Sequence, residues 1–221
     1  VYHKSKNYAK TKKYYFKSIK IREKLAEDNP FRYIYKLAES YNNIAKLYSD
    51  QDYYIEAERY YFEAIKILEQ LVKYNSDRYN FDLAESYDGI ALLCDKQNQF
   101  ENTEMYYLKA IDIREQLVKK SPNKHNSYLA RSYSNIAAFY HENKHNKKAE
   151  NYYLKAIVIR EKLIKENSKK YNSALALNYY NYAVLKNGDI IYYMKAHVLA
   201  LNQPEEPNCN QILENLKHIF Y

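Results

Sequence analysis

The chain has 221 residues, of which 47% are hydrophobic, so it is long enough and apolar enough to bury a core. It contains 29 Tyr but only 2 Gly and 4 Pro, and glycine is needed at the turns of sheets and wherever a backbone approaches a phosphate. This composition argues against a β-sandwich, a P-loop fold and a dinucleotide fold, and it predicts an all-helical protein.

The cysteine content and the hydropathy predict a cytoplasmic protein. Cys94 and Cys209 are too few for a disulfide scaffold and lack metal-type spacing, which fits a reducing compartment. No apolar run approaches the roughly 18–20 residues that a membrane span requires, so we expect no membrane contact. There is no signal peptide, and because the chain begins with Val1 rather than Met we expect an excised or processed piece.

The formal net charge of +8 comes entirely from the first 24 residues, where nine Lys and Arg face a single acid, Glu23. The remainder of the chain is balanced, whereas a nucleic-acid-binding surface would be more uniformly basic. We therefore do not expect nucleic acid as the main partner. Two alternatives remain open for this basic N-terminal helix, namely contact with nucleic acid or another polyanion, and a solvated outer face. The nine bases are Lys4, Lys6, Lys10, Lys12, Lys13, Lys17, Lys20, Arg22 and Lys24.

Two sequence words recur through the chain with a spacing of 46 residues. The first series is AESYNNIA from Ala38, AESYDGIA from Ala84, ARSYSNIA from Ala130 and ALNYYNYA from Ala176. The second series is YYFKSIKIREKL from Tyr14, YYFEAIKILEQL from Tyr60, YYLKAIDIREQL from Tyr106 and YYLKAIVIREKL from Tyr152. Four copies in register, without an insertion or deletion, indicate a repeat protein.

Each copy contains two amphipathic stretches, which we name helix A and helix B. The apolar face of helix A is Leu37, Tyr41, Ile44, Ala45 and Tyr48, and that of helix B is Ala57, Tyr61, Ala64, Ile65 and Leu68. A short polar link between the two predicts antiparallel neighbours. Because one such pair cannot bury its face alone, stacking of pairs is expected to form the core.

The residues of both helices resemble the tetratricopeptide repeat (TPR) family over roughly residues 7–200. The matching positions are Tyr41, Ile44, Ala45, Ala57, Tyr61 and Ala64, and then Tyr133, Ile136, Ala137, Ala149, Tyr153 and Ala156, whereas Thr103 departs from the pattern. The resemblance implies an all-α, right-handed superhelical solenoid of antiparallel helix pairs. It also implies a non-catalytic scaffold without cofactor or metal, whose helix-A face lines a groove for a protein or peptide partner.

Helix B is expected to be longer than in the usual 34-residue unit of this family. The usual unit ends helix B at a proline, whereas this chain has Glu23, Glu69, Glu115 and Glu161 at that position. Glutamate continues a helix that proline would break. A helix of about 22 residues is roughly 33 Å long, so the repeats are similar to the elongated repeats of kinesin light chains.

The repeats predict one solenoid over residues 1–221. Its expected parts are helix B of a truncated first repeat at 7–28, repeats at 31–75, 77–121 and 123–167, a degenerate last repeat at 170–202, and a capping helix at 208–221. The sequence leaves the oligomeric state open. The chain could also be the sensor or adaptor part of a larger multidomain protein.

Residues His141 to His145 fit the pattern H-E-x-x-H, which in zinc proteases lies within a helix. In this chain the repeat register aligns them with residues 95–99 and 49–53, the links between helix A and helix B. A turn points the two imidazoles apart, so we expect neither a metal site nor an enzyme. The tyrosine pairs that begin at residues 14, 60, 106 and 152 could stack nucleobases, but one of each pair holds a core position.

The predicted peptide-binding groove is centred on one position of helix A, two residues after its key tyrosine. This position holds Asn43, Gly89, Asn135 and Asn181. An asparagine amide carries a donor and an acceptor, so it can pair with the backbone of a bound peptide. The other predicted groove residues are Asn42, Lys46, Glu85, Asp88, Arg131 and Tyr180. The groove lacks the Lys and Arg set of repeats that clamp a C-terminal carboxylate, so a tail of that kind is not expected.

Overall fold

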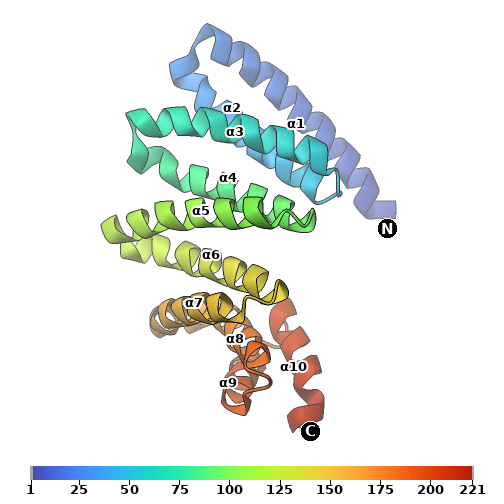
Figure 1. The fold of residues 1–221 in the computed structure, drawn as a ribbon. Helices are drawn as coiled ribbons and strands as arrows, with labels where there is room; N and C mark the ends of the chain where they lie inside the picture. The colour runs from blue at the N-terminus through green and yellow to red at the C-terminus, as the bar shows by residue number, and fades with distance from the viewer. Residues whose placement is uncertain (1, 221) are drawn as a thin grey trace. The chain divides into compact units, whose positions relative to one another are not determined.

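The structure is a computed structural model that describes the backbone of residues 2–220 and the side chains of residues 8, 10–30 and 32–219. This part of the chain is built of α-helices without a strand (Figure 1), which confirms the predicted all-α repeat fold. The helices are α1 (Tyr2–Asp28), α2 (Pro30–Ser49), α3 (Tyr54–Tyr74), α4 (Ser76–Lys96), α5 (Phe100–Lys120), α6 (Pro122–Glu142), α7 (Asn146–Glu166), α8 (Ser168–Leu185), α9 (Ile190–Leu201) and α10 (Pro207–Phe220).

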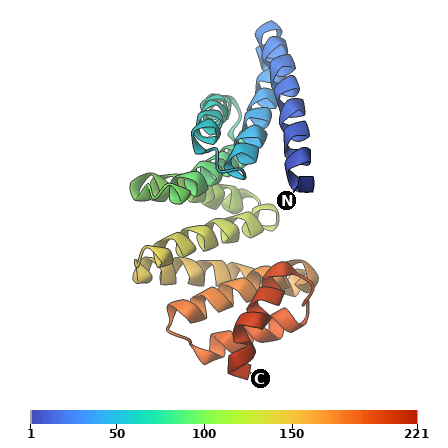
Figure 2. The same cartoon turned by 90° about the vertical axis from the view of Figure 1, so that its right-hand side faces the viewer.

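Contacts divide the chain into two compact units, Val1–Leu117 and Val118–Tyr221, which we call unit 1 and unit 2. Within unit 1, α2 packs against α1, α3 and α4. Within unit 2, α7 packs between α6 and α8, and α10 lies against α8 and α9 (Figure 2). The organisation as a single array with the repeat limits given above stays a prediction, and Val1 and Tyr221 lie outside the described residues.

The link between helix A and helix B repeats its backbone conformation in every hairpin. Each link contains a left-handed residue at the same repeat position, with φ of 60° at Asp52, 57° at Asn98, 63° at Lys144 and 58° at Asn187, and in the last link Gly188 also has a positive φ of 90°. In the link that contains Lys144, α6 has already ended and α7 has not begun. The H-E-x-x-H string therefore spans a turn, as the repeat register predicted.

The start of helix A is fixed by an asparagine cap. The side-chain oxygens of Asn29, Asn75 and Asn167 accept hydrogen bonds from the backbone N–H three residues later, at 3.3, 3.1 and 3.1 Å. Such a cap satisfies one of the four N–H groups that a helix start leaves without a partner. The cap recurs at equivalent positions in α2, α4 and α8, whereas the equivalent Ser121 at the start of α6 makes no side-chain cap bond.

Fully buried alanines mark the contacts between helices. Because their side chains are small, the helix backbones can approach closely. The alanines with no exposed surface include Ala38, Ala45, Ala57, Ala64, Ala84, Ala91, Ala110, Ala130, Ala137, Ala149, Ala156, Ala176 and Ala183.

Tyrosines fill the space beside these alanines. Tyr60 stacks on Tyr48 of helix A with 5.9 Å between ring centroids, and Tyr152 stacks on Tyr140 at the same separation. Tyr61, Tyr107 and Tyr153 are buried in the core. The core interpretation of the tyrosine pairs is thus confirmed for α3, α5 and α7, and in α1 Tyr15 packs against the core while its neighbour Tyr14 is 59% exposed.

Helix B is long, as expected, with 21 residues in each of α3, α5 and α7. The glutamate that replaces the usual proline has a second role, because it accepts a hydrogen bond from the key tyrosine of the next helix A. The Tyr41 hydroxyl donates to Glu23 at 2.9 Å, and the Tyr179 hydroxyl donates to Glu161 at 2.5 Å. The Tyr87 hydroxyl donates to Glu69 in the same way. This bond ties each helix B to the helix that follows it.

These buried hydroxyls predict alkaline unfolding. Burial, and then the hydrogen bond to glutamate, raises the pKa of Tyr41, Tyr87 and Tyr179 above the usual 10. A pKa raised in the folded state contributes stability that is present below pH 10 and is lost as the pH rises further. We expect the melting temperature to fall steeply above about pH 10.

The measurement is a series of thermal melts by circular dichroism, with tyrosinate absorbance recorded in parallel. Exposed tyrosines should ionise while the helices remain, and the buried ones only as helix is lost. Complete ionisation of all tyrosines with the helix signal intact would contradict the prediction.

Candidate functional site

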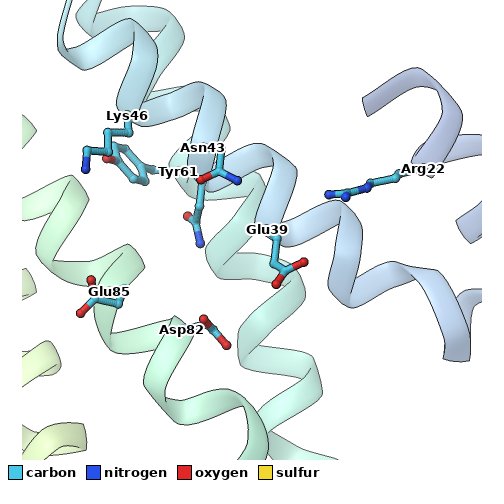
Figure 3. Close-up of a pocket in the computed structure, with 8 residues that line it drawn as sticks. Arg22, Glu39, Asn43, Lys46, Tyr61, Asp82 and Glu85 are labelled. Carbon is cyan, nitrogen blue, oxygen red and sulfur yellow. The ribbon is translucent and has the colours of Figure 1, made fainter. Parts of the chain in front are cut away.

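A polar pocket of about 430 Å³ opens between α2 and α4 in unit 1 (Figure 3). Helix α2 provides four of its residues, and α1, α3 and α4 provide the others. Its lining is Arg22, Glu39, Asn42, Asn43, Lys46, Tyr61, Asp82 and Glu85. Four of the predicted groove residues, Asn42, Asn43, Lys46 and Glu85, are therefore brought together on one surface.

Asn42 holds the wall of this pocket together. Its Nδ2 donates to Ser86 Oγ at 2.7 Å, and Ser86 Oγ lies 3.0 Å from Asn42 Oδ1. This pair joins α2 to α4, so much of the hydrogen-bonding capacity of Asn42 is used within the protein. By contrast, Asn43 and Lys46 are exposed and point their polar groups to solvent.

The opposite side of the pocket is acidic. Asp82 Oδ2 accepts a hydrogen bond from the Tyr35 hydroxyl at 2.9 Å. Burial raises the pKa of Asp82, and the nearby charges of Glu39 and Glu85 add to the rise. Glu39 in turn pairs with Lys36 at 2.8 Å. The pocket thus places carboxylates opposite the cationic Lys46, a mixed surface suited to polar and charged groups.

The Tyr61 ring lies where a side chain of residue 89 would begin. A Cβ atom built on Gly89 would lie 2.5 Å from Tyr61 Cε1, so a larger residue at this position would require the ring to shift. In unit 2 the equivalent position is Asn181, whose hydrogen bond to the Tyr153 hydroxyl partly offsets the burial that raises the pKa of Tyr153. Asn135 and Asn181 are both half-buried.

Asp88 does not face a ligand, contrary to the expectation from the sequence. It is 5% exposed, and its carboxylate pairs with the guanidinium of Arg114. Arg114 is completely buried and also binds Glu85. A buried arginine requires counter-charges of this kind. Asp88 therefore neutralises Arg114 from within the wall, and only Glu85 of the two reaches the pocket.

In unit 2 the predicted groove residues have neighbours of their own. The Arg131 guanidinium lies over the Tyr128 ring, 5.5 Å from its centroid. The Tyr180 hydroxyl accepts a hydrogen bond from Asn215 Nδ2 of α10 at 3.0 Å, and the Tyr180 ring packs on Tyr193. Helix α10 thus contacts the hydroxyl of Tyr180 directly.

Family comparisons assign the repeats. Residues 37–77 and 129–168 match one profile of the tetratricopeptide repeat, and residues 84–117 match another. The chain belongs to the tetratricopeptide repeat family. Proteins of this family are generally non-catalytic scaffolds that bind protein partners. No curated protein matches the chain, and none of the described helices has the length and apolarity needed to cross a membrane.

Solved structures share the fold of this TPR protein. It is similar to BtubC (BKLC) from P. vanneervenii, with 20% identity, a TM-score of 0.74, and coverage of 96% of this chain and 83% of that one. It is also similar to the apo form of RapI, with 19% identity, a TM-score of 0.71, and coverage of 97% and 76%. Aspartyl phosphate phosphatase F from Bacillus subtilis follows with 18% identity, a TM-score of 0.52, and coverage of 83% and 50%.

Arg22 of α1 is a pocket residue that the sequence interpretation missed. Its Nη1 donates to the Lys36 carbonyl at 2.7 Å and to Ser40 Oγ at 2.5 Å. Arg160 Nη1 makes the equivalent bonds, to the Ala174 carbonyl at 2.7 Å and to Asn178 Oδ1. The signal lies in the second sequence word, whose fourth residue from the end is arginine in the first, third and fourth copies (IREKL, IREQL and IREKL). The second copy has Leu68 at this position. Tyr61 and Asp82 were also missed as pocket residues.

The Arg114 network predicts a large effect on stability. Replacing Arg114 with Leu leaves the buried carboxylate of Asp88 without its counter-charge, which should cost about 3–5 kcal/mol of unfolding free energy. One repeat earlier, Leu68 stands at the position of Arg114, and Asn42 stands at the position of Asp88. We therefore expect Asp88→Asn to recover much of the loss caused by Arg114→Leu.

The measurement is urea denaturation of the single and double variants. Arg22→Leu serves as the matched control, because Arg22 is only half-buried and lacks a carboxylate partner among the described residues. An Arg114→Leu variant no less stable than this control would contradict the network.

Proposed function

We propose that this TPR protein is a non-catalytic scaffold whose helix-A face binds an extended or helical segment of a partner protein. The observation that carries the proposal is the pocket between α2 and α4, where Asn43 and Lys46 are exposed beside Glu85. Family membership supports binding of a protein partner. The scaffold could act as the sensor or adaptor part of a longer protein.

The chemistry of the pocket favours a peptide over a small apolar ligand. An exposed asparagine amide pairs with a peptide N–H and C=O whatever the side chain, whereas the surrounding charges select among side chains. Ligand pockets for small molecules are lined mainly by apolar groups, and this one is lined mainly by charged residues and amides. A reducing, cytoplasmic location is part of the proposal, since Cys94 and Cys209 are free and buried.

Binding should depend on the asparagine amides of helix A. Peptides selected by display against the purified protein provide the ligands, and fluorescence anisotropy measures their affinity. Asn43→Ala and Asn135→Ala should each weaken binding by about 1–3 kcal/mol for every buried pair lost, without loss of the helix signal. Asn151→Ala makes the same change at an exposed residue of α7, a helix B. Equal affinities for all three variants would rule out the helix-A face as the binding surface.

A second candidate function is contact with a polyanion through α1. Five lysines of this helix are exposed and follow one another at intervals of three and four residues, which places them on one face over roughly 21 Å. They are Lys10, Lys13, Lys17, Lys20 and Lys24, and we call them the lysine stripe. None of them has an ion-pair partner in the described part of the chain. Lys6 continues the spacing, but its side chain lies outside the described residues.

The lysine stripe predicts salt-dependent binding of a duplex DNA probe. Counterion release makes the logarithm of the affinity fall with the logarithm of the salt concentration, with a slope of about −0.9 per phosphate contacted. Lys13→Gln with Lys17→Gln should therefore reduce the slope by about two. The double variant Lys66→Gln with Lys73→Gln removes the same charge from α3. Binding that is absent, or equally sensitive to both variants, would exclude this function for the stripe.

A further inference from the structure

The pocket of unit 1 contains a buried hydroxyl group without a hydrogen-bond partner. Tyr61 of α3 lines this pocket and is only 6% exposed, yet its hydroxyl makes no hydrogen bond within the described residues. The oxygen is not sealed from the pocket, in contrast to Gln51 Nε2, which is buried completely without a partner. A buried polar group without a partner costs free energy. A ligand that forms a hydrogen bond with this hydroxyl removes that cost.

The equivalent tyrosine of unit 2 has the partner that Tyr61 lacks. Tyr153 forms a hydrogen bond with the side chain of Asn181. In unit 1 the position of Asn181 is held by Gly89. The Tyr61 hydroxyl oxygen lies 2.7 Å from the point where a Cβ atom of residue 89 would be. The hydroxyl therefore lies where a side chain of residue 89 would begin, and without an amide there it is available to a ligand.

Carboxylates from two helices line the same pocket. Glu39 extends from α2 and Asp82 from α4 into the space between these helices (Figure 3). Asp82 is half-buried and accepts one hydrogen bond, from the neutral hydroxyl of Tyr35. No ion pair joins Asp82 to a cation within the described residues. Its Oδ1 can therefore accept a hydrogen bond from a ligand.

Neighbouring negative charges act on both of these groups. Burial raises the pKa of Asp82, and the charges of Glu39 and Glu85 add to the rise. Burial also raises the pKa of Tyr61, and here the charges of Asp50 and Glu85 contribute. The hydroxyl and the carboxylate, which come from different helices, are thus both in surroundings that favour a positive charge over a further negative one.

The two cations of the lining leave these acceptors open. Arg22 directs its Nη1 to the Lys36 carbonyl and to Ser40 Oγ on α2. Lys46 is exposed. Neither Arg22 nor Lys46 forms an ion pair with a carboxylate in the part of the chain that the structure describes. The pocket therefore combines acceptors on α3 and α4 with no donor of its own directed at them except Tyr35.

We propose that this pocket binds the cationic side chain of an arginine or lysine in the partner segment. The charged N–H groups donate to the hydroxyl oxygen of Tyr61 and to the carboxylates of Asp82 and Glu39. Arginine and lysine carry several donors and no acceptor, which matches this set. Hydrogen bonds between charged groups are also roughly twice as strong as neutral ones. The inference rests on the proposed scaffold function and adds the chemistry that one residue of the partner must carry.

The first test follows the backbone amide signal of Gly89 in an NMR titration with capped peptides. The chain has only two glycines, so the amide of Gly188 in the last link is an internal control. The probes are Ac-Gly-Arg-Gly-NH₂, Ac-Gly-Lys-Gly-NH₂ and the citrulline counterpart of the first, which keeps its shape without the charge. We expect a saturable shift of the Gly89 signal with the charged probes only.

A shift with only one of the two charged probes would support the site and narrow its ligand to that side chain. Equal shifts with arginine and citrulline would overturn the proposal, because the charge would then play no part. The proposal would also be overturned by the absence of any shift, or by the same shift with sodium chloride at equal concentration.

The second test removes the hydroxyl from Tyr61 and, as a matched control, from Tyr153. Because the Tyr61 hydroxyl has no partner in the fold, Tyr61→Phe should not lower the melting temperature, but it should weaken the arginine probe by about threefold or more. Tyr153→Phe removes the bond to Asn181, so it should lower the melting temperature and leave the affinity within about twofold. Unchanged affinity in Tyr61→Phe would show that the hydroxyl does not bind the ligand.

The third test removes the charge of Asp82. Asp82→Asn keeps an acceptor for the Tyr35 hydroxyl. Because the pKa of this carboxyl is raised in the folded state, loss of its charge should not lower the melting temperature. The affinity for the arginine probe should fall by about fivefold or more. Asp112→Asn makes the same change at an exposed residue of α5 and should leave the affinity within about twofold. Equal affinities for the two variants would overturn the proposal.

The two proposals fail in different ways. Display-selected peptides that depend on Asn43 but contain neither arginine nor lysine would leave the scaffold function standing and remove the site for a basic side chain. Binding of the arginine probe at Gly89, without any selected peptide that depends on Asn43 or Asn135, would have the opposite meaning.

Discussion

The buried alanines at the helix contacts are the constraint on which the other features of this TPR protein depend. They have no exposed surface, and they recur at equivalent positions in both helices. Small side chains let neighbouring helices approach closely. Only at such a short separation can Asn42 of one helix A bond directly to Ser86 of the next, or Arg22 of α1 reach the backbone of α2. A larger side chain at the seam would break the polar contacts together with the packing.

The polar contacts in turn give each joint between helices its specificity. Apolar contacts alone would let one helix slide along its neighbour. A buried donor that loses its acceptor, by contrast, lowers the stability of the fold. The bond from Tyr179 to Glu161 and the bond from Arg160 to the Ala174 carbonyl both join α7 to α8. They connect residues 18 and 14 positions apart, the same separations as the bonds from Tyr41 to Glu23 and from Arg22 to Lys36. These equal separations therefore place each helix A in the same way against the helix B before it, and so fix the geometry of the helix-A face that carries the pocket.

The fold could be predicted from the sequence because every copy gives the same information. The 46-residue period, the alanines and the asparagine caps all recur, so each joint is specified several times. The site was predicted only in part. Asn43 and Lys46 lie where the helical periodicity places them, but Asp88 follows the same periodicity and is buried by Arg114. These two residues are 26 positions apart, and the sequence does not show which side chain crosses the seam between helices.

The positions that break the repeat change the character of the helix-A face from one copy to the next. The asparagine row is interrupted at Gly89, where the ring of Tyr61, a residue of the unit 1 pocket, occupies the space of a side chain. Glu85 and Asp88, which pair with Arg114 of helix B, are replaced one repeat later by Arg131 and Ser134. Both changes leave the alanine seam untouched. A repeat array can therefore change the charges on its helix-A face from copy to copy while the buried alanines of the seam are kept.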